Sequence, residues 1–266
     1  MQRWNTGLMP STNLEEVARR QIADYDRREP GTAFADGLSL SIDDAYQVQT
    51  LAVDLRRQRG EQVIGYKVGC TSPVIRNRLN VQHPVFGRLF DTECWPSGTC
   101  LPSSRFANLA IEGEFAIRLA ADLTETNQSD ASICDAIESV FPVIELHNLV
   151  FRGNQPTEQE LIANNALHAG FVQGDNSPVG LNQDAASLRI EIDGKKVAVV
   201  TGSELIQTIV ESLRWLTGEL GKRHLKLQAR QTVLCGSVAD LFPVPNGCHI
   251  SVETDRFGKV ECTTAE

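Results

Sequence analysis

The sequence predicts an α+β fold, with a helical region over residues 1–60 and a β-rich catalytic domain over residues 61–266. In the first region, apolar residues recur at helical spacing between start and stop signals. After residue 61 the pattern changes to the alternation typical of strands, in many segments of unequal length. Few helical segments separate these strands. We therefore expect a β-rich α+β domain and not a doubly wound parallel sheet.

Two N-terminal helices are predicted, over residues 12–28 and 41–59. Thr12 and Glu15 have the spacing of a capping box, which marks the start of the first helix. Ser41 and Asp44 mark the start of the second, and Gly60 is a favourable C-terminal stop. The apolar residues of both helices form one stripe, which predicts that each buries a single face.

The β-rich part is predicted to alternate strands with short helices. Strands are expected at residues 62–68, 85–90, 111–119, 141–146, 168–173, 188–192, 197–200, 232–235, 249–253 and 259–263. Helices are expected at residues 73–79, 130–138, 157–164 and 203–220, the last capped by Ser203. Asp193-Gly194 predicts a hairpin turn. The Gly/Pro/Ser-rich residues 96–104 and the polar residues 175–184 predict loops.

Composition excludes several classes of function. The chain has 34 acidic against 25 basic residues and no Lys/Arg-rich block, which argues against nucleic-acid and anionic-membrane partners. It contains no apolar run near 18 residues and no apolar leader, so we expect no membrane span. Its seven cysteines are scattered and never in C-x-x-C spacing. Free thiols in a cytoplasmic protein are therefore expected, without disulfides or structural zinc.

Three carboxylates are the central candidates for chemistry. Glu112 and Glu114 lie two apart on a predicted strand and project from one face, and Glu145 interrupts an apolar run. A buried carboxylate is costly unless it is paired or binds metal. We therefore hypothesise that the three hold one hard divalent cation such as Mg²⁺ or Mn²⁺. The alternative is that Glu112 and Glu114 lie on a solvated face.

Lys67 and His147 are the candidates for proton transfer. Lys67 lies between Gly65 and Gly69, which would allow close approach of a ligand, although a lysine facing water is the alternative. His147 follows Glu145 by two residues and shares its face of the strand. This position is equally compatible with a purely structural histidine. The chain lacks H-E-x-x-H, G-x-S-x-G, P-loop and G-x-G-x-x-G motifs, so the commonest zinc, serine-hydrolase and nucleotide sites are excluded.

Residues 65–72, G-Y-K-V-G-C-T-S, resemble the G-x-K-x-G-x-T-S signature of the 2-keto-4-pentenoate hydratase and 4-oxalocrotonate decarboxylase family, within the fumarylacetoacetate hydrolase-like superfamily. Further segments match in the family's order, at residues 84–87, 111–114, 143–145, 164–166 and 233–237. The resemblance covers about residues 40–262. It implies helices followed by a mixed β-sandwich or roll, and a homo-oligomer.

The resemblance also implies a site and a substrate. It places Mg²⁺ or Mn²⁺ on Glu112, Glu114 and Glu145. A small 2-oxo acid would chelate the metal, which stabilises an enolate. Lys67 would be the proton donor or electrostatic partner. Asn165 and Ser237 would bind the substrate.

Departures from the family pattern leave the reaction open. Val85 stands where hydratases carry aspartate, and Asn164 and Leu167 replace an acid and a hydroxyl. His147 or His168 would then supply a lost polar group. We expect a metal-dependent hydratase acting on an unsaturated 2-oxo acid. The alternatives are a decarboxylase, which Val85 favours, an acylpyruvate C–C hydrolase, for which the sequence shows no clear glutamate–histidine pair, and a non-catalytic homologue.

Overall fold

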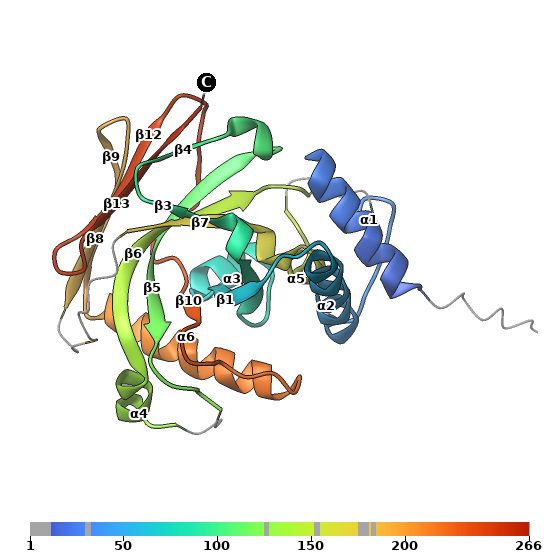
Figure 1. Ribbon diagram of the computed structural model, residues 1–266, viewed down its shortest axis with the longest axis horizontal. Helices are drawn as coiled ribbons and strands as arrows, with labels where there is room; N and C mark the ends of the chain where they lie inside the picture. Colours follow the sequence, from blue (N-terminus) through green and yellow to red (C-terminus); the bar gives the residue numbers. More distant parts are fainter. Residues whose placement is uncertain are drawn as a thin grey trace, which may run out of the picture.

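Two mixed β-sheets, flanked by helices, make up the structure (Figure 1), a computed structural model that describes residues 12–29, 33–124, 128–151, 155–174, 181 and 185–265. Helices α1 (Leu14–Arg27) and α2 (Ile42–Gln58) pack against each other at one side of the molecule. They precede the described strands, as the sequence predicts. No helix in the described ranges has the length and apolar character needed to cross a membrane.

The starts of these two helices test the capping predictions. Ser41 caps α2, and its side chain accepts from the amide of Asp44, as predicted. The prediction for α1 is wrong by one residue, because Asn13 and not Thr12 is the cap. Its side-chain oxygen accepts from the amide of Glu16, and asparagine is among the most favourable N-cap residues.

The larger sheet has eight strands and carries the candidate site residues. Seven lie in the order β2 (Val85–Phe90), β1 (Val63–Gly69), β10 (Thr232–Leu234), β5 (Leu109–Leu119), β6 (Ile137–Asn148), β7 (His168–Gln173) and β3 (Cys94–Pro96). The short β11 (Phe242–Pro243) pairs with β5. The pairs β1–β10 and β3–β7 are parallel, whereas the other pairs are antiparallel. The sheet curls until β2 contacts β7, which gives a roll with an inner face.

The smaller sheet packs on the outer face of the roll. Its five strands lie in the order β4 (Thr99–Leu101), β13 (Lys259–Thr264), β12 (His249–Thr254), β8 (Ala186–Ile192) and β9 (Lys195–Gly202). At Gly113 on β5, a Cβ atom would lie 2.7 Å from the side chain of Ile190 and 3.0 Å from that of Val252. Glycine therefore allows the two sheets to approach closely here.

The inner face of the roll is divided between an apolar part and a charged part. Even-numbered residues of β5 point inward, and Ala116 belongs to an inner apolar cluster separate from the main core. The cluster consists of Leu89, Ala116, Phe141, Val143, Phe171 and Leu234. Farther along the same rows of β5 and β6 come Glu114, Glu112 and Glu145. The strand alternation thus places the carboxylates beside a dry apolar floor.

Helices and turns complete the fold. The remaining helices are α3 (Pro73–Leu79), α4 (Asp130–Asp135), α5 (Glu158–Ala163) and the longest, α6 (Glu204–Gly221), with single 3₁₀ turns at η1 (Asp91–Glu93), η2 (Ser103–Arg105) and η3 (Asn165–Leu167). Asp193 and Gly194 both have positive φ, at 51° and 71°, as the predicted hairpin turn requires. Ser203 is at the start of α6, but its side chain makes no capping hydrogen bond.

Several predicted boundaries are wrong, and two of them concern the kind of element. The helix predicted over residues 130–138 ends at Asp135, because Ile137 already pairs with Leu119 as the first residue of β6. The predicted loop over residues 96–104 contains the short strand β4, which pairs with β13. Most of the predicted loop over residues 175–184 lies outside the described residues.

Candidate active site

The register of β5 and β6 brings the predicted carboxylates together. Glu112 and Glu145 are directly opposite each other across the two strands, and Glu114 lies one inward-facing position farther along β5. Glu114 and Glu145 have no exposed surface, and Lys67 on β1 is 2% exposed. The alternatives of a solvated glutamate face and of a lysine facing water are therefore wrong.

Glu145 lies at the centre of the cluster. Its Oε1 atom is 3.1 Å from Lys67 Nζ and 2.7 Å from Nδ1 of His168. Its Oε2 atom lies 3.3 Å from His147 Nε2 in an ion-pair contact, but it has no hydrogen-bond partner among the described residues. One oxygen is thus held by two donors, whereas the other is left with unused acceptor capacity inside the protein.

Glu112 and His147 form a second pair, with 3.0 Å between Oε2 and Nε2. The side chain of Glu112 is 19% exposed and that of His147 is 7% exposed. The sequence shows no clear glutamate–histidine pair, because these two residues are 35 positions apart and meet only through strand pairing. Ligand atoms of Glu112, Glu145 and His147 lie within 4.8 Å of one another, close enough to hold one metal ion.

Glu114 is tied to the end of β10. Its Oε2 accepts from the amide of Gly236 at 3.0 Å, and its buried Oε1 has no hydrogen-bond partner in the described part of the chain. Burial raises the pKa of Glu114 well above its usual range, and the charges of Glu145 and Glu112 raise it further. A bound cation would reverse this effect by favouring the ionised carboxylate.

The charges of the other groups follow from their neighbours. Burial by itself lowers the pKa of Lys67, but Glu145 and the other two glutamates outweigh it, so the net pKa is raised and the lysine is charged. Burial likewise lowers the pKa of His147 and the neighbouring glutamates raise it, so that the net pKa is about 9. Burial lowers the pKa of His168, which is therefore a neutral imidazole near pH 7.

The two glycines beside Lys67 have structural functions of their own. A Cβ atom on Gly65 would lie 1.8 Å from the carbonyl oxygen of Thr232, where β1 and β10 pair. A Cβ atom on Gly69 would lie 3.2 Å from Lys67 Nζ. Gly65 therefore allows close approach of the β10 backbone, and Gly69 allows close approach of the lysine ammonium. The sequence had instead suggested that these glycines allow close approach of a ligand.

The two residues expected to bind substrate are placed differently. Both ends of the Asn165 side-chain amide are occupied, since Oδ1 accepts from the backbone amide of Arg88 and Nδ2 donates to its carbonyl. Ser237 Oγ donates to the carbonyl of Ala239. Ser237 also lines a groove of about 560 Å³ with Thr71, Ser72 and Arg76 from the loop and helix that follow β1. Only Ser237 is therefore at a cavity of substrate size.

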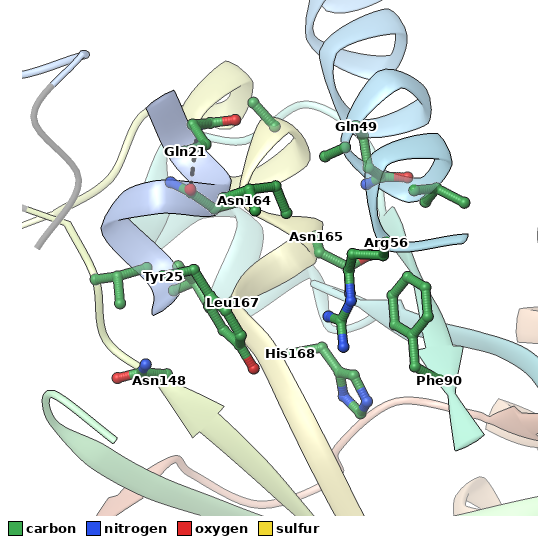
Figure 2. Close-up of a pocket in the computed structure, with 15 residues that line it drawn as sticks. Gln21, Tyr25, Gln49, Arg56, Phe90, Asn148, Asn164, Asn165, Leu167 and His168 are labelled. Atoms are coloured by element: carbon green, nitrogen blue, oxygen red, sulfur yellow. Dashed lines mark hydrogen bonds between the residues drawn. The ribbon is translucent and has the colours of Figure 1, made fainter. Parts of the chain in front are cut away.

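A smaller cavity of about 50 Å³ lies between α1, α2 and the start of β7 (Figure 2). It is lined on one side by His168, whose Nε2 atom is buried and has no hydrogen-bond partner among the described residues. Tyr25 and Arg56 also line it, and both contact the buried Glu93, at 2.6 Å and 2.8 Å. The space fits water molecules rather than a substrate. No sequence pattern predicted this buried cluster, because its members come from distant parts of the chain.

Curated relatives resemble the chain over most of its length. A 2-hydroxypent-2,4-dienoate hydratase of Pseudomonas putida is 30% identical over 217 residues, which cover 80% of this chain and 98% of the relative. The chain belongs to the 2-keto-4-pentenoate hydratase family. A 2-keto-4-pentenoate hydratase of Burkholderia vietnamiensis is 28% identical. The match covers 84% of the present chain and 86% of that hydratase. The resemblance inferred from the motifs is thereby confirmed. No family model matches.

Solved structures confirm the fold of this family member. The 4-oxalocrotonate decarboxylase from Pseudomonas putida G7, complexed with magnesium and adipate, has a TM-score of 0.89 and 21% identity, covering 97% of this chain and 99% of its own. Fumarylpyruvate hydrolase from Pseudomonas aeruginosa, in complex with Mn²⁺ and pyruvate, has a TM-score of 0.60 and 14% identity. The match covers 75% of this chain and 88% of the hydrolase chain. The predicted roll of the fumarylacetoacetate hydrolase type is therefore correct.

Proposed function

We propose that this protein is a metal-dependent hydratase that adds water to an unsaturated 2-oxo acid, such as a 2-hydroxy-2,4-dienoate in its keto form. The observation that carries the proposal is the cluster of the partly exposed Glu112 with the buried Glu114, Glu145 and Lys67 on the inner face of the roll. The relatives named as hydratases over most of the chain support the same reaction class.

The donor atoms of the cluster fit a divalent cation. Two buried carboxylate oxygens, Glu145 Oε2 and Glu114 Oε1, lack hydrogen-bond partners among the described residues, and such acceptors are costly to leave unused. With Glu112 they provide the oxygen ligands that Mg²⁺ and Mn²⁺ prefer. When bound, the cation would supply Lewis-acid polarisation of a 2-oxo acid that chelates it through carboxylate and keto oxygens.

Lys67 is the proposed proton-transfer and charge-stabilising group. Its ammonium pairs with Glu145, and Gly69 leaves room for it because glycine has no side chain. The position of the ammonium is therefore fixed without substrate. From there it can donate a proton to the substrate carbon skeleton or offset negative charge on the 2-oxo oxygen. His147 is a second candidate for proton transfer, because its buried side chain contacts Glu145 and pairs with Glu112.

The groove lined by Ser237 and Thr71 is the proposed approach for substrate. Gly236, the neighbour of Ser237, donates its amide to Glu114, which links one wall of the groove to the carboxylate cluster through the chain. We propose that Ser237 contacts the substrate. Asn165 would act indirectly, by fixing η3 against β2 and thereby setting the position of His168.

Decarboxylation is the second candidate reaction. Val85 pairs with Gly69 near the cluster and is 1% exposed, so this position provides an apolar wall and no proton donor. The structural likeness to 4-oxalocrotonate decarboxylase over 97% of the chain is consistent with that chemistry. An apolar wall would accommodate loss of carbon dioxide without protonating the group that leaves.

A product analysis separates these reactions. The protein, loaded with Mn²⁺ or Mg²⁺, is incubated with 2-hydroxypenta-2,4-dienoate, with 4-oxalocrotonate and with an acylpyruvate. The proposal predicts a 4-hydroxy-2-oxo acid from the dienoate and dependence on added cation. Release of carbon dioxide from 4-oxalocrotonate alone would favour the decarboxylase, and cleavage of the acylpyruvate alone would favour a C–C hydrolase.

We also propose that the protein is a cytoplasmic homo-oligomer, with residues 61–266 as its catalytic domain. Each of the seven cysteines, all in described ranges, is free, which suits a reducing compartment. Light scattering after gel filtration tests the assembly state, and a single-chain mass would contradict it.

A further inference from the structure

The position of His147 within the carboxylate cluster leads to an inference about the metal itself, which rests on the cation site of the proposed function. Glu145 Oε1 is already engaged by Lys67 at 3.1 Å and by His168 at 2.7 Å. Its other oxygen, Oε2, has no hydrogen-bond partner among the described residues and is therefore the atom available to a cation.

Two further atoms converge on the same point. His147 Nε2 lies 3.3 Å from Glu145 Oε2 and 3.0 Å from Glu112 Oε2. Strand pairing fixes this arrangement, because Glu112 and Glu145 are Cα partners and His147 is the next inward-facing residue of β6. Separations near 3 Å between donor atoms are those expected for ligands that share one ion with bonds of about 2 Å.

We propose that His147 is a ligand through Nε2, so that the site combines imidazole nitrogen with carboxylate oxygen and prefers a transition-metal dication over Mg²⁺. Imidazole suits Fe²⁺, Co²⁺, Ni²⁺ and Zn²⁺, whereas all-oxygen sets with water suit Mg²⁺. Mn²⁺ accepts both kinds of donor and is the weakest binder of the transition-metal group. A set consisting only of the three glutamates would follow the same order of metals with a smaller preference over Mg²⁺.

Within the cluster the two histidines have separate functions. His168 contacts only the occupied oxygen Oε1 of Glu145, and its side chain lines the 50 Å³ cavity on the side of α1 and α2. It therefore positions Glu145, as hydrogen-bonding partners of metal ligands commonly do. His147 lies on the side of the unused oxygen, where a cation would bind.

Metal selectivity tests the inference through binding alone. Isothermal titration of the metal-free protein should show Co²⁺ or Zn²⁺ binding at least 100-fold more tightly than Mg²⁺. In His147→Gln, which keeps a polar side chain of similar reach, the affinity for Co²⁺ should fall by 10- to 100-fold or more. The affinity for Mg²⁺ should change by less than about threefold. Equal losses for both metals would overturn the inference.

Pulsed electron paramagnetic resonance of the Mn²⁺-loaded protein identifies the nitrogen directly. Coupling of one imidazole ¹⁴N to the manganese is expected in the wild type and in the matched control His168→Gln, and its absence is expected in His147→Gln. Mn²⁺ bound without nitrogen coupling in the wild type would overturn the inference. So would coupling that persists in His147→Gln.

A structural measurement covers the case in which His147→Gln does not fold. A crystal of the wild type soaked with Zn²⁺ should place Nε2 of His147 about 2.0–2.1 Å from the metal. A zinc ion bound by glutamates alone, with the imidazole hydrogen-bonded to Glu112, would contradict the inference. Nitrogen coupling without dienoate turnover would leave this inference intact and overturn the proposed function. Turnover without coupling would do the reverse.

Discussion

Replacing Lys67 by methionine would remove an ammonium group that is buried against three carboxylates. The side chain is 2% exposed, and its nitrogen lies 3.1 Å from Glu145 Oε1. Removing one partner of a buried ion pair typically costs about 3–5 kcal/mol of folding free energy, because the other charge is left without compensation. At about 2–4 °C per kcal/mol for a chain near this length, the melting temperature should fall by roughly 6–20 °C without metal.

The assay is thermal unfolding in EDTA and in saturating Mn²⁺. The deficit of Lys67→Met should shrink in Mn²⁺, because a site that has lost a positive charge binds the cation more tightly and binding stabilises the folded state. Dienoate turnover should fall by about 10²–10⁴-fold, as expected for loss of a positioned proton donor. Lys226→Met is the matched control, since Lys226 is 50% exposed and pairs with Asp122 on the surface. Equal melting temperatures for the two variants in EDTA would refute the reasoning.

Three more outcomes are expected. If His147 binds the metal as proposed, the cation displaces a proton from this residue, whose pKa is raised to about 9. Apparent metal affinity should then rise about tenfold per pH unit up to that pH. Titration in buffers of different ionisation enthalpy would detect the released proton. Gly65→Ala should fold poorly, since its Cβ would lie 1.8 Å from the β10 backbone. Gly218 in α6 has open space around it, so in urea unfolding Gly218→Ala should gain about 0.5–1 kcal/mol of unfolding free energy. Arg56→Met should lose about 3–5 kcal/mol in the same assay, because it leaves Glu93 buried without its closest cation.

Local sequence signals predicted most of the elements. The helix over residues 73–79 and the strands over residues 85–90 and 168–173 have the predicted bounds, because caps, glycines and apolar alternation act within a few residues. The strands β3, β4 and β11 were not predicted. Each has three residues or fewer and exists through pairing with a distant partner, which leaves no periodic signal.

The candidate site could be predicted only in part, for the same reason. Strand alternation placed Glu112 and Glu114 on one face, and the apolar run around Glu145 indicated burial. The contacts of His168 with Glu145 and of His147 with Glu112 join residues 23 and 35 positions apart. They depend on which strands are neighbours in the roll. The proposal of a mixed site in place of an all-carboxylate one therefore required the structure.

Cation-dependent hydration of 2-hydroxypenta-2,4-dienoate tests the central claim most directly. Loss of the dienoate ultraviolet absorbance should require added Mn²⁺ or another divalent cation and should stop in EDTA. Glu145→Gln, which removes the charge of the central carboxylate but keeps its size, should abolish both turnover and metal binding. Turnover at an unchanged rate in EDTA, or by Glu145→Gln, would contradict the assignment of this cluster as the active site.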